Sequence, residues 1–304
     1  MAICLLALLA VAGSRPCGLA ASSDPPGQAG PEDAQKAQLA EGWRQVYLTN
    51  WPKAATLFEA VLEESGDREV RAEALYGLAN LWQTRQPGPN LDKALHDYKR
   101  VTAEFADTRA APWAHLALAR LADQPEHEKE RDLALARETY ERILRDYPDH
   151  YVADEAALRL GFSYLEAVGV RESEDQGVAI FEKRLASRPR NTLAIPMRML
   201  LGNLYERRGE YRKAADQWMA ADAIGIPLSE QGTSYYKIAL AAERHLKDYA
   251  LAVKYWQKIA TEVPMDSRSY VARLAVERCR RLAAQGPETG AAAPRARTAG
   301  EAAR

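Results

Sequence analysis

Histidine residues are the side chains of this sequence that most often serve as metal ligands or general bases. None of the five pairs with another at metal-ligand spacing, and His127-Glu128 lacks the second histidine that a zinc-protease helix requires. They are His96, His115, His127, His150 and His245. We therefore predict no metal site, and we interpret the histidines as isolated surface residues.

Sequence motifs for covalent catalysis and for phosphate binding are also missing. No glycine-rich loop precedes a Lys-Ser or Lys-Thr pair, and Gly-x-Ser-x-Gly does not occur. Aspartate and glutamate are plentiful, but helical surfaces account for them. We predict no catalytic residue and no cofactor. A carboxylate pair assembled from distant segments is the alternative, and it would make the protein an enzyme or a subunit of one.

A large aromatic residue returns every 37 to 42 positions along the chain. A small residue lies four positions before each aromatic, so both fall on one face of a helix. The small residue lets a neighbouring backbone approach, and the aromatic fills the gap between units. The pairs are Ala54 with Phe58, Ala94 with Tyr98, Ala136 with Tyr140, Gly177 with Phe181, Ala214 with Trp218, and Ala252 with Trp256. The residue three positions after the aromatic is mostly apolar, and Arg184 is the exception.

A second amphipathic helix is predicted before each of these, with its own small marker residue. Glycine inside a helix costs about 1 kcal/mol relative to alanine, so its recurrence at one phase indicates close helix packing. The markers are Gly42, Gly77, Ala117, Gly161, Gly202 and Ala239.

The fifth copy of the pattern is the clearest, with Leu201-Gly202, Tyr205, Ala214, Trp218 and Ala221. These residues resemble the tetratricopeptide repeat, a 34-residue helix-turn-helix unit. The resemblance implies an all-α fold, a right-handed α-solenoid of about six such repeats followed by a C-terminal capping helix. It also implies a non-enzymatic role in binding other proteins.

The predicted organisation has four parts. They are a signal peptide over 1–20, a linker over 21–32, the solenoid over 33–285 and a disordered tail over 286–304. Within the solenoid, the repeats are predicted at about 33–66, 70–107, 110–149, 152–190, 194–227 and 229–265, with the capping helix at 267–285.

The middle repeats are longer than the family pattern. The family places the second-helix alanine 12 residues after the marker, as in copies one and five, whereas copies two, three and four have 17, 19 and 16. The additional residues are polar and turn-rich, which predicts longer loops along one edge of the stack. This edge is either a tolerated insertion or a partner-contacting surface.

Charge and the N-terminal segment limit the partners and the location. The 41 basic and 42 acidic residues are mixed, so we predict no nucleic-acid partner. Ile3 to Ala12 form an apolar run, which Gly18-Leu19-Ala20 follows, and this resembles a secretory signal peptide. The run is shorter than the roughly 20 residues of a membrane span. Arg15-Pro16 before Cys17 does not suit a lipoprotein signal.

Partner contacts are assigned by the resemblance to the first helix of each repeat, which lines a concave groove in this family. Trp82 and Phe162 would be aromatic anchors, or would pack against the long loops or the next helix. The groove residues carried over from the marker positions are Trp82, Glu155, Phe162, Glu166, Met199, Asn203, Arg207 and Tyr236.

The predicted function is a protein-binding scaffold of the bacterial cell envelope, periplasmic or secreted, whose partner is a protein or peptide. Arg145-Asp146-Tyr147-Pro148-Asp149 resembles the helix ending in periplasmic repeat proteins of outer-membrane assembly and the Tol–Pal cell-division system. A cytoplasmic adaptor or co-chaperone is the alternative if the N-terminus is no signal. Homo-oligomerisation stays open.

Overall fold

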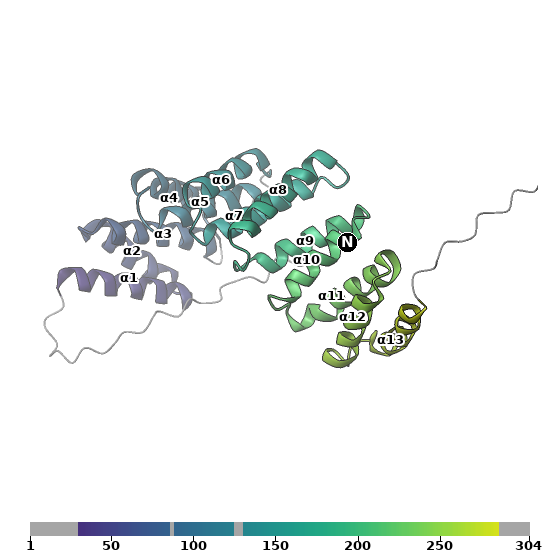
Figure 1. The fold of residues 1–304 in the computed structure, drawn as a ribbon. Helices are drawn as coiled ribbons and strands as arrows, with labels where there is room; N and C mark the ends of the chain where they lie inside the picture. The colour runs from purple at the N-terminus through teal and green to yellow at the C-terminus, as the bar shows by residue number, and fades with distance from the viewer. Residues whose placement is uncertain (1–29, 86–87, 125–129, 286–304) are drawn as a thin grey trace, which may run out of the picture.

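The computed structural model describes residues 30–85, 88–124 and 130–285, and within these ranges all regular secondary structure is helical. Successive helices form hairpins that stack from α1 at one end to α13 at the other (Figure 1). The prediction of an all-α solenoid is confirmed. The predicted signal peptide, most of the linker and the predicted tail lie outside the described residues.

Six hairpins and one final helix make up the stack. In each hairpin we call the first member a first helix and the other a second helix. The hairpins are α1 (Pro31–Tyr47) with α2 (Trp51–Glu64), α3 (Arg68–Thr84) with α4 (Leu91–Glu104), α5 (Ala111–Asp123) with α6 (Leu133–Asp146), α7 (Val152–Leu165) with α8 (Arg171–Ser187), α9 (Ala194–Arg207) with α10 (Tyr211–Asp222), and α11 (Leu228–Leu240) with α12 (Tyr249–Glu262), and α13 (Ser269–Ala284) follows them.

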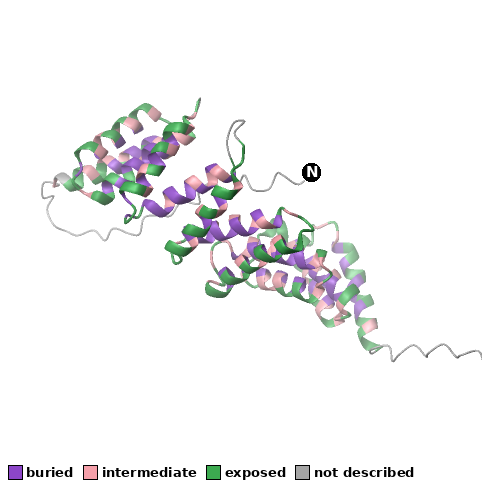
Figure 2. Ribbon diagram, turned by 90° about the horizontal axis from the view of Figure 1, so that it is seen from above, coloured by how far each residue is buried: buried purple, intermediate pink, exposed green. Residues whose placement is uncertain are grey.

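Buried positions follow the contacts between the helices (Figure 2). The small and aromatic residues of the repeat are among them. Phe58 lies between Gly42 and Gly77, where an added Cβ would come within 2.6 and 2.8 Å of its ring. Gly161 and Gly202 give the same close approach to Phe181 and Trp218. Buried throughout are Gly42, Ala54, Phe58, Gly77, Ala94, Tyr98, Ala136, Tyr140, Gly161, Phe181, Gly202, Tyr205, Ala214, Trp218, Ala252 and Trp256.

Two of the predicted small markers, Gly77 and Ala117, do not pack against the second helix of their own hairpin. Gly77 packs on Phe58 of the preceding hairpin, and it is Ala79 that packs with Ala94 and Tyr98 of its own hairpin. In α5, Ala119 likewise packs with Ala136 and Tyr140, whereas Ala117 belongs to the cluster of the preceding hairpin. The equivalent positions are therefore two residues later than predicted in repeats two and three.

Connections within the middle hairpins remain long after this correction. The segments between α3 and α4, α5 and α6, and α7 and α8 have six, nine and five residues, against three between α1 and α2. Residues 86–87 and 125–129 of these segments lie outside the described residues. In the sixth hairpin, α11 continues as a π-helix over Ala241–Leu246, which accommodates one additional residue between Ala239 and Ala252.

Arg184, the exception in the apolar pattern, has a buried partner. Its guanidinium donates from Nε to Asp154 Oδ1 at 2.7 Å, from Nη2 to the same oxygen, and from Nη1 to the Pro148 carbonyl at 2.7 Å. The side chains of Arg184 and Asp154 are 7% and 2% exposed. This ion pair replaces an apolar contact between α7 and α8.

Candidate functional site

Side chains that join one first helix to the next define an inner face of the stack. On α1 and α3, the Trp43 indole donates to Glu73 Oε1 at 3.0 Å, and its ring lies 6.2 Å from Tyr76. Burial raises the pKa of Tyr76 to about 12, and the charges of Arg120 and Glu155 also act on it. Tyr76 thus lies within electrostatic reach of the residues that α5 and α7 contribute to the same face.

An aromatic cluster lies where α5 and α7 begin. The Trp113 ring meets Tyr151 edge-on at 4.7 Å, and His150 stacks on Tyr151 at 4.5 Å. Tyr151 is 54% exposed, whereas Trp113 is half-buried. We call Trp43, Tyr76, Trp113 and Tyr151 the aromatic row, because each of the four first helices α1, α3, α5 and α7 or its N-terminal flank supplies one member.

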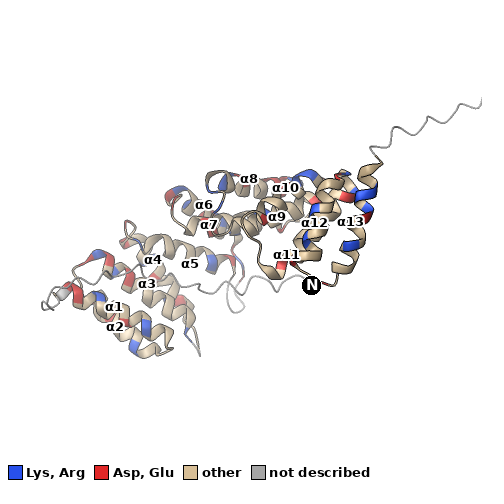
Figure 3. Ribbon diagram, turned by 60° about the horizontal axis from the view of Figure 1, so that its bottom comes forward, with Lys and Arg blue, Asp and Glu red and all other residues tan. Residues whose placement is uncertain are grey.

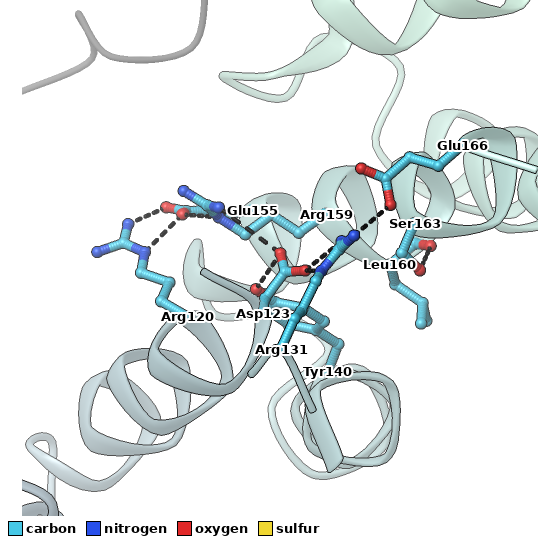
Figure 4. A network of polar contacts seen from close by, with 9 residues as sticks. All are labelled: Arg120, Asp123, Arg131, Tyr140, Glu155, Arg159, Leu160, Ser163 and Glu166. Carbon is cyan, nitrogen blue, oxygen red and sulfur yellow. Dashed lines mark hydrogen bonds and ion pairs between the residues drawn. The ribbon is translucent and has the colours of Figure 1, made fainter. Parts of the chain in front are cut away.

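Next to the aromatic row, an ionic network joins α5 to α7 (Figure 4). Arg120 holds Glu155 through both guanidinium branches, with Nε to Oε1 at 2.7 Å, and Arg159 Nε donates to the same Oε1 at 2.6 Å. Arg131 bridges Asp123 at 2.5 Å and Glu166 at 2.7 Å. The network alternates in sign, and basic and acidic side chains are similarly interspersed along the described helices (Figure 3).

The arginines of the network favour the ionised form of Glu155. Burial alone would raise the pKa of Glu155, but hydrogen bonds and charges from Arg120 and Arg159 outweigh burial, and the net pKa is lowered. A carboxyl in this state is a poor general acid at neutral pH. Among the described residues no cluster of three histidine, cysteine or acidic side chains could hold a metal ion. The geometry favours cohesion and binding over acid–base chemistry.

Comparison with protein-family models agrees with the repeat architecture. A tetratricopeptide-repeat family model matches residues 115–150 and 233–264, which include parts of α5 with α6 and of α11 with α12. These two segments are tetratricopeptide repeats. The solved structure of MamA from AMB-1 is 16% identical, with a TM-score of 0.33, over 79% of this chain and 97% of that chain. No curated protein matches the sequence.

In tetratricopeptide-repeat proteins the helices form a scaffold for protein partners, typically without catalysis. None of the helices in the described ranges has the length and hydrophobicity that a membrane span requires.

The residues predicted on α7 and just after it lie at this face, and two of them are engaged. Glu155 is held by Arg120 and Arg159, and Glu166 is held by Arg131. Phe162 is half-buried, and it follows Gly161 just as Trp43 follows Gly42. Of these three predicted residues, Phe162 is the one with an apolar surface that no charge pairing occupies.

The residues predicted on α9 and α11 join neighbouring repeats. Asn203 Oδ1 accepts from Lys237 Nζ at 2.7 Å, and Met199 Sδ lies 3.9 Å from the Ser234 hydroxyl. Two others face different neighbours. Arg207 pairs with Glu174 of α8 at 2.9 Å, and the Tyr236 ring packs edge-on against Trp256 at 5.6 Å. These side chains hold the stack together before any partner arrives.

Trp82 is not part of the inner face, which corrects its predicted placement. Its indole packs against the core clusters on both sides of α3, and Lys93 Nζ of α4 lies 3.7 Å from the ring centre. The predicted marker in the second repeat lies two residues too early. This turns the predicted faces of α3 by about 200° about the helix axis, which explains why Trp82 is predicted on the wrong face.

Sequence reasoning missed all four members of the aromatic row. With Ala79 and Ala119 as markers, Glu73, Trp113 and Glu155 all stand six residues before a marker. Trp43, Arg120, Phe162 and Asn203 then all stand one residue after a marker. This alignment of the copies is the signal that could have placed Trp113 and Arg120 on the inner face.

A hollow lies on the other side of α5, between α4 and α6. It is a cavity of about 360 Å³, and its lining combines the buried His115 and five leucines with charged side chains such as Lys99, Glu138 and Arg142. Burial lowers the pKa of His115, which corrects its interpretation as a surface residue. The leucines are Leu91, Leu95, Leu118, Leu121 and Leu135. We call this region the outer cavity.

Proposed function

We propose that this protein is a binding scaffold of the bacterial cell envelope, and that the inner face from α1 to α7 holds an extended, largely apolar segment of a partner protein. The aromatic row carries this proposal. It presents ring surface from four successive first helices, and Tyr151 remains more than half exposed in the free chain. Partly exposed aromatics beside a rigid polar network are typical interface anchors.

The neighbouring charges explain why the segment should be apolar. Glu155, Arg159 and Asp123 already satisfy one another, so an incoming charge would have to displace an existing partner. A segment with aliphatic or proline side chains needs no such exchange, and it can pack its side chains against the rings. Because the helices are pre-stacked, ordering the partner is the main entropic cost.

The envelope location is supported by the apolar run from Ile3 to Ala12 and the small residues Gly18-Leu19-Ala20. Mass spectrometry of the N-terminus of the protein purified from its own cells tests it. A mature chain starting near Ala21 supports export, whereas an intact Met1 in the cytosolic fraction favours a cytoplasmic adaptor or co-chaperone.

Photo-crosslinking tests the binding surface directly. A photoreactive phenylalanine replaces Tyr151 of the inner face, Leu135 of the outer cavity, or the exposed Glu59 of α2 in separate variants. We expect a discrete partner adduct from position 151 and none from positions 135 and 59. An adduct from position 135 alone would transfer the function to the outer cavity.

A further inference from the structure

The last helix of the solenoid exposes an apolar surface on the side away from the stack. Tyr270, Val271 and Leu274 are 71%, 50% and 49% exposed, and Met265 in the preceding loop is 96% exposed. Tyr270 and Leu274 are four residues apart and Val271 and Leu274 are three apart, so the three side chains form one patch. We call this patch the α13 face.

A helix that only caps a solenoid has one apolar side. The buried side of α13 consists of Ala272, Ala275, Val276 and Cys279, which complete the core of the last repeat. The outer side of a terminal repeat is normally polar, because it faces water. An apolar outer side therefore indicates that a further surface packs against it.

The C-terminal segment of this chain offers little to cover the α13 face. The segment 286–304 contains no valine, leucine, isoleucine, methionine or aromatic residue. At the opposite end of the stack, the exposed positions along most of α1 are charged residues or alanines. They are Glu32, Asp33, Ala34, Lys36, Ala37, Ala40 and Arg44, and the exposed Tyr47 and Leu48 at the C-terminal end of the helix are the exceptions. Head-to-tail stacking would thus place an apolar surface on a largely charged one.

The charged residues beside the α13 face are complementary to the same residues of a second copy. Arg273 and Glu277 are exposed, and neither has an ion-pair partner within the described part of the chain. In an antiparallel pair of α13 helices with a twofold axis between the levels of Leu274 and Ala275, Leu274 lies next to its own copy. Arg273 of each copy then lies opposite Glu277 of the other, so the symmetry produces two such pairs.

We propose that the α13 face is a homodimer interface, in which α13 packs antiparallel against α13 of a second copy. Tyr270 would lie near Arg281 of the second copy, where a ring and a guanidinium attract each other. The proposed contact is a single helix face on each copy, so we expect a weak dimer whose population depends on concentration. A twofold contact uses the same patch on both copies, and assembly stops at two.

Sedimentation equilibrium of the full chain over a range of concentrations tests the proposal by charge reversal. Arg273→Glu places like charges opposite each other twice, and so does Glu277→Arg, so each variant should dissociate at least tenfold more readily than the wild type. The double variant Arg273→Glu/Glu277→Arg restores both pairs and should restore the dimer. An equimolar mixture of the two single variants should form heterodimers.

Leu274→Asp should give a monomer, and Glu141→Arg on the exposed side of α6 is the matched control that should leave the dimer unchanged. Circular dichroism checks that each variant is folded. A monomeric wild type at every concentration would overturn the proposal. A double variant no better than the single ones would also overturn it, because it would indicate a partner of another kind. Continued growth beyond the dimer would indicate head-to-tail stacking instead.

Discussion

Replacing Arg184 with isoleucine restores the apolar pattern of the repeat, yet it should destabilise the protein. The change removes the guanidinium that donates to Asp154 and to the Pro148 carbonyl, and the Asp154 carboxylate stays in place at 1% exposure. An uncompensated charge at such a site costs about 3 to 5 kcal/mol. The repeat consensus therefore predicts that Arg184→Ile raises the free energy of unfolding, whereas the buried charge predicts that it lowers it.

The double variant Arg184→Ile/Asp154→Ala separates the two effects. It removes both charges, and Ala72 occupies the position equivalent to Asp154 in α3, seven residues before Ala79. We expect its stability to lie within about 2 kcal/mol of the wild type, because a buried pair can be replaced by apolar groups at little cost.

Hydrogen exchange of the full chain measures this effect locally. Amides of α7 and α8 in Arg184→Ile should exchange at least a hundredfold faster than in the wild type, since 1.4 kcal/mol corresponds to a factor of ten. Amides of α12 should change much less, since repeats contact mainly their neighbours. Unchanged protection in α7 and α8 would refute the conclusion that the Arg184–Asp154 pair supports the α7–α8 hairpin.

Three further predictions concern packing, reactivity and pH. Gly202→Ala should cost about 1 to 3 kcal/mol in urea unfolding because its Cβ would meet the Trp218 ring, whereas Gly66→Ala has open space around it and should be near neutral. Burial raises the pKa of Cys279 to about 11, so its thiol should react with a disulfide reagent at pH 8 only after unfolding. The pKa of Glu155 is lowered from 4.5 in the folded chain, so its stabilising effect is present above pH 4.5 and is lost as the pH falls through the folded value. Thermal melting of wild type and Glu155→Gln should therefore differ at pH 6 and converge towards pH 3.

Each of these outcomes has a clear opposite. Equal costs for the two glycine variants would contradict the close approach at Trp218. Rapid labelling of Cys279 itself in the folded chain, located by peptide mass spectrometry because the sequence also contains Cys4 and Cys17, would contradict its burial. A melting difference that persists unchanged at pH 3 would show that Glu155 stabilises the α5–α7 joint by packing rather than by charge.

The repeat itself could be predicted from the sequence because its core needs small residues under aromatic ones. Phe58 requires glycine at both Gly42 and Gly77, and Trp218 requires it at Gly202. Such sites leave a periodic record in the chain. In α3 two small residues meet this requirement, and the prediction uses the wrong one. Gly77 packs against the aromatic residue of the preceding repeat, whereas Ala79 packs within its own repeat. A marker residue alone cannot say which neighbour it faces.

The candidate site was harder to predict, since it depends on partners about 35 residues away. Arg120 and Glu155 look like ordinary surface charges until α5 and α7 place them together. Arg207 was assigned to partner binding, but its contact with Glu174 joins α9 to α8. Ion pairs between repeats depend on the twist of the stack and on the length of the side chains. The local sequence pattern predicts neither the twist nor the resulting contacts.

The affinity of the partner segment for inner-face variants tests the central claim most directly. Once crosslinking has identified the segment, isothermal titration compares the wild type with Trp113→Ala/Tyr151→Ala, and Leu135→Ala in the outer cavity is the control. Loss of two anchor rings should cost at least 2 kcal/mol, about thirtyfold in Kd, and the control should bind as the wild type does. An unchanged Kd for the double variant, or a loss confined to Leu135→Ala, would contradict the assignment of the inner face.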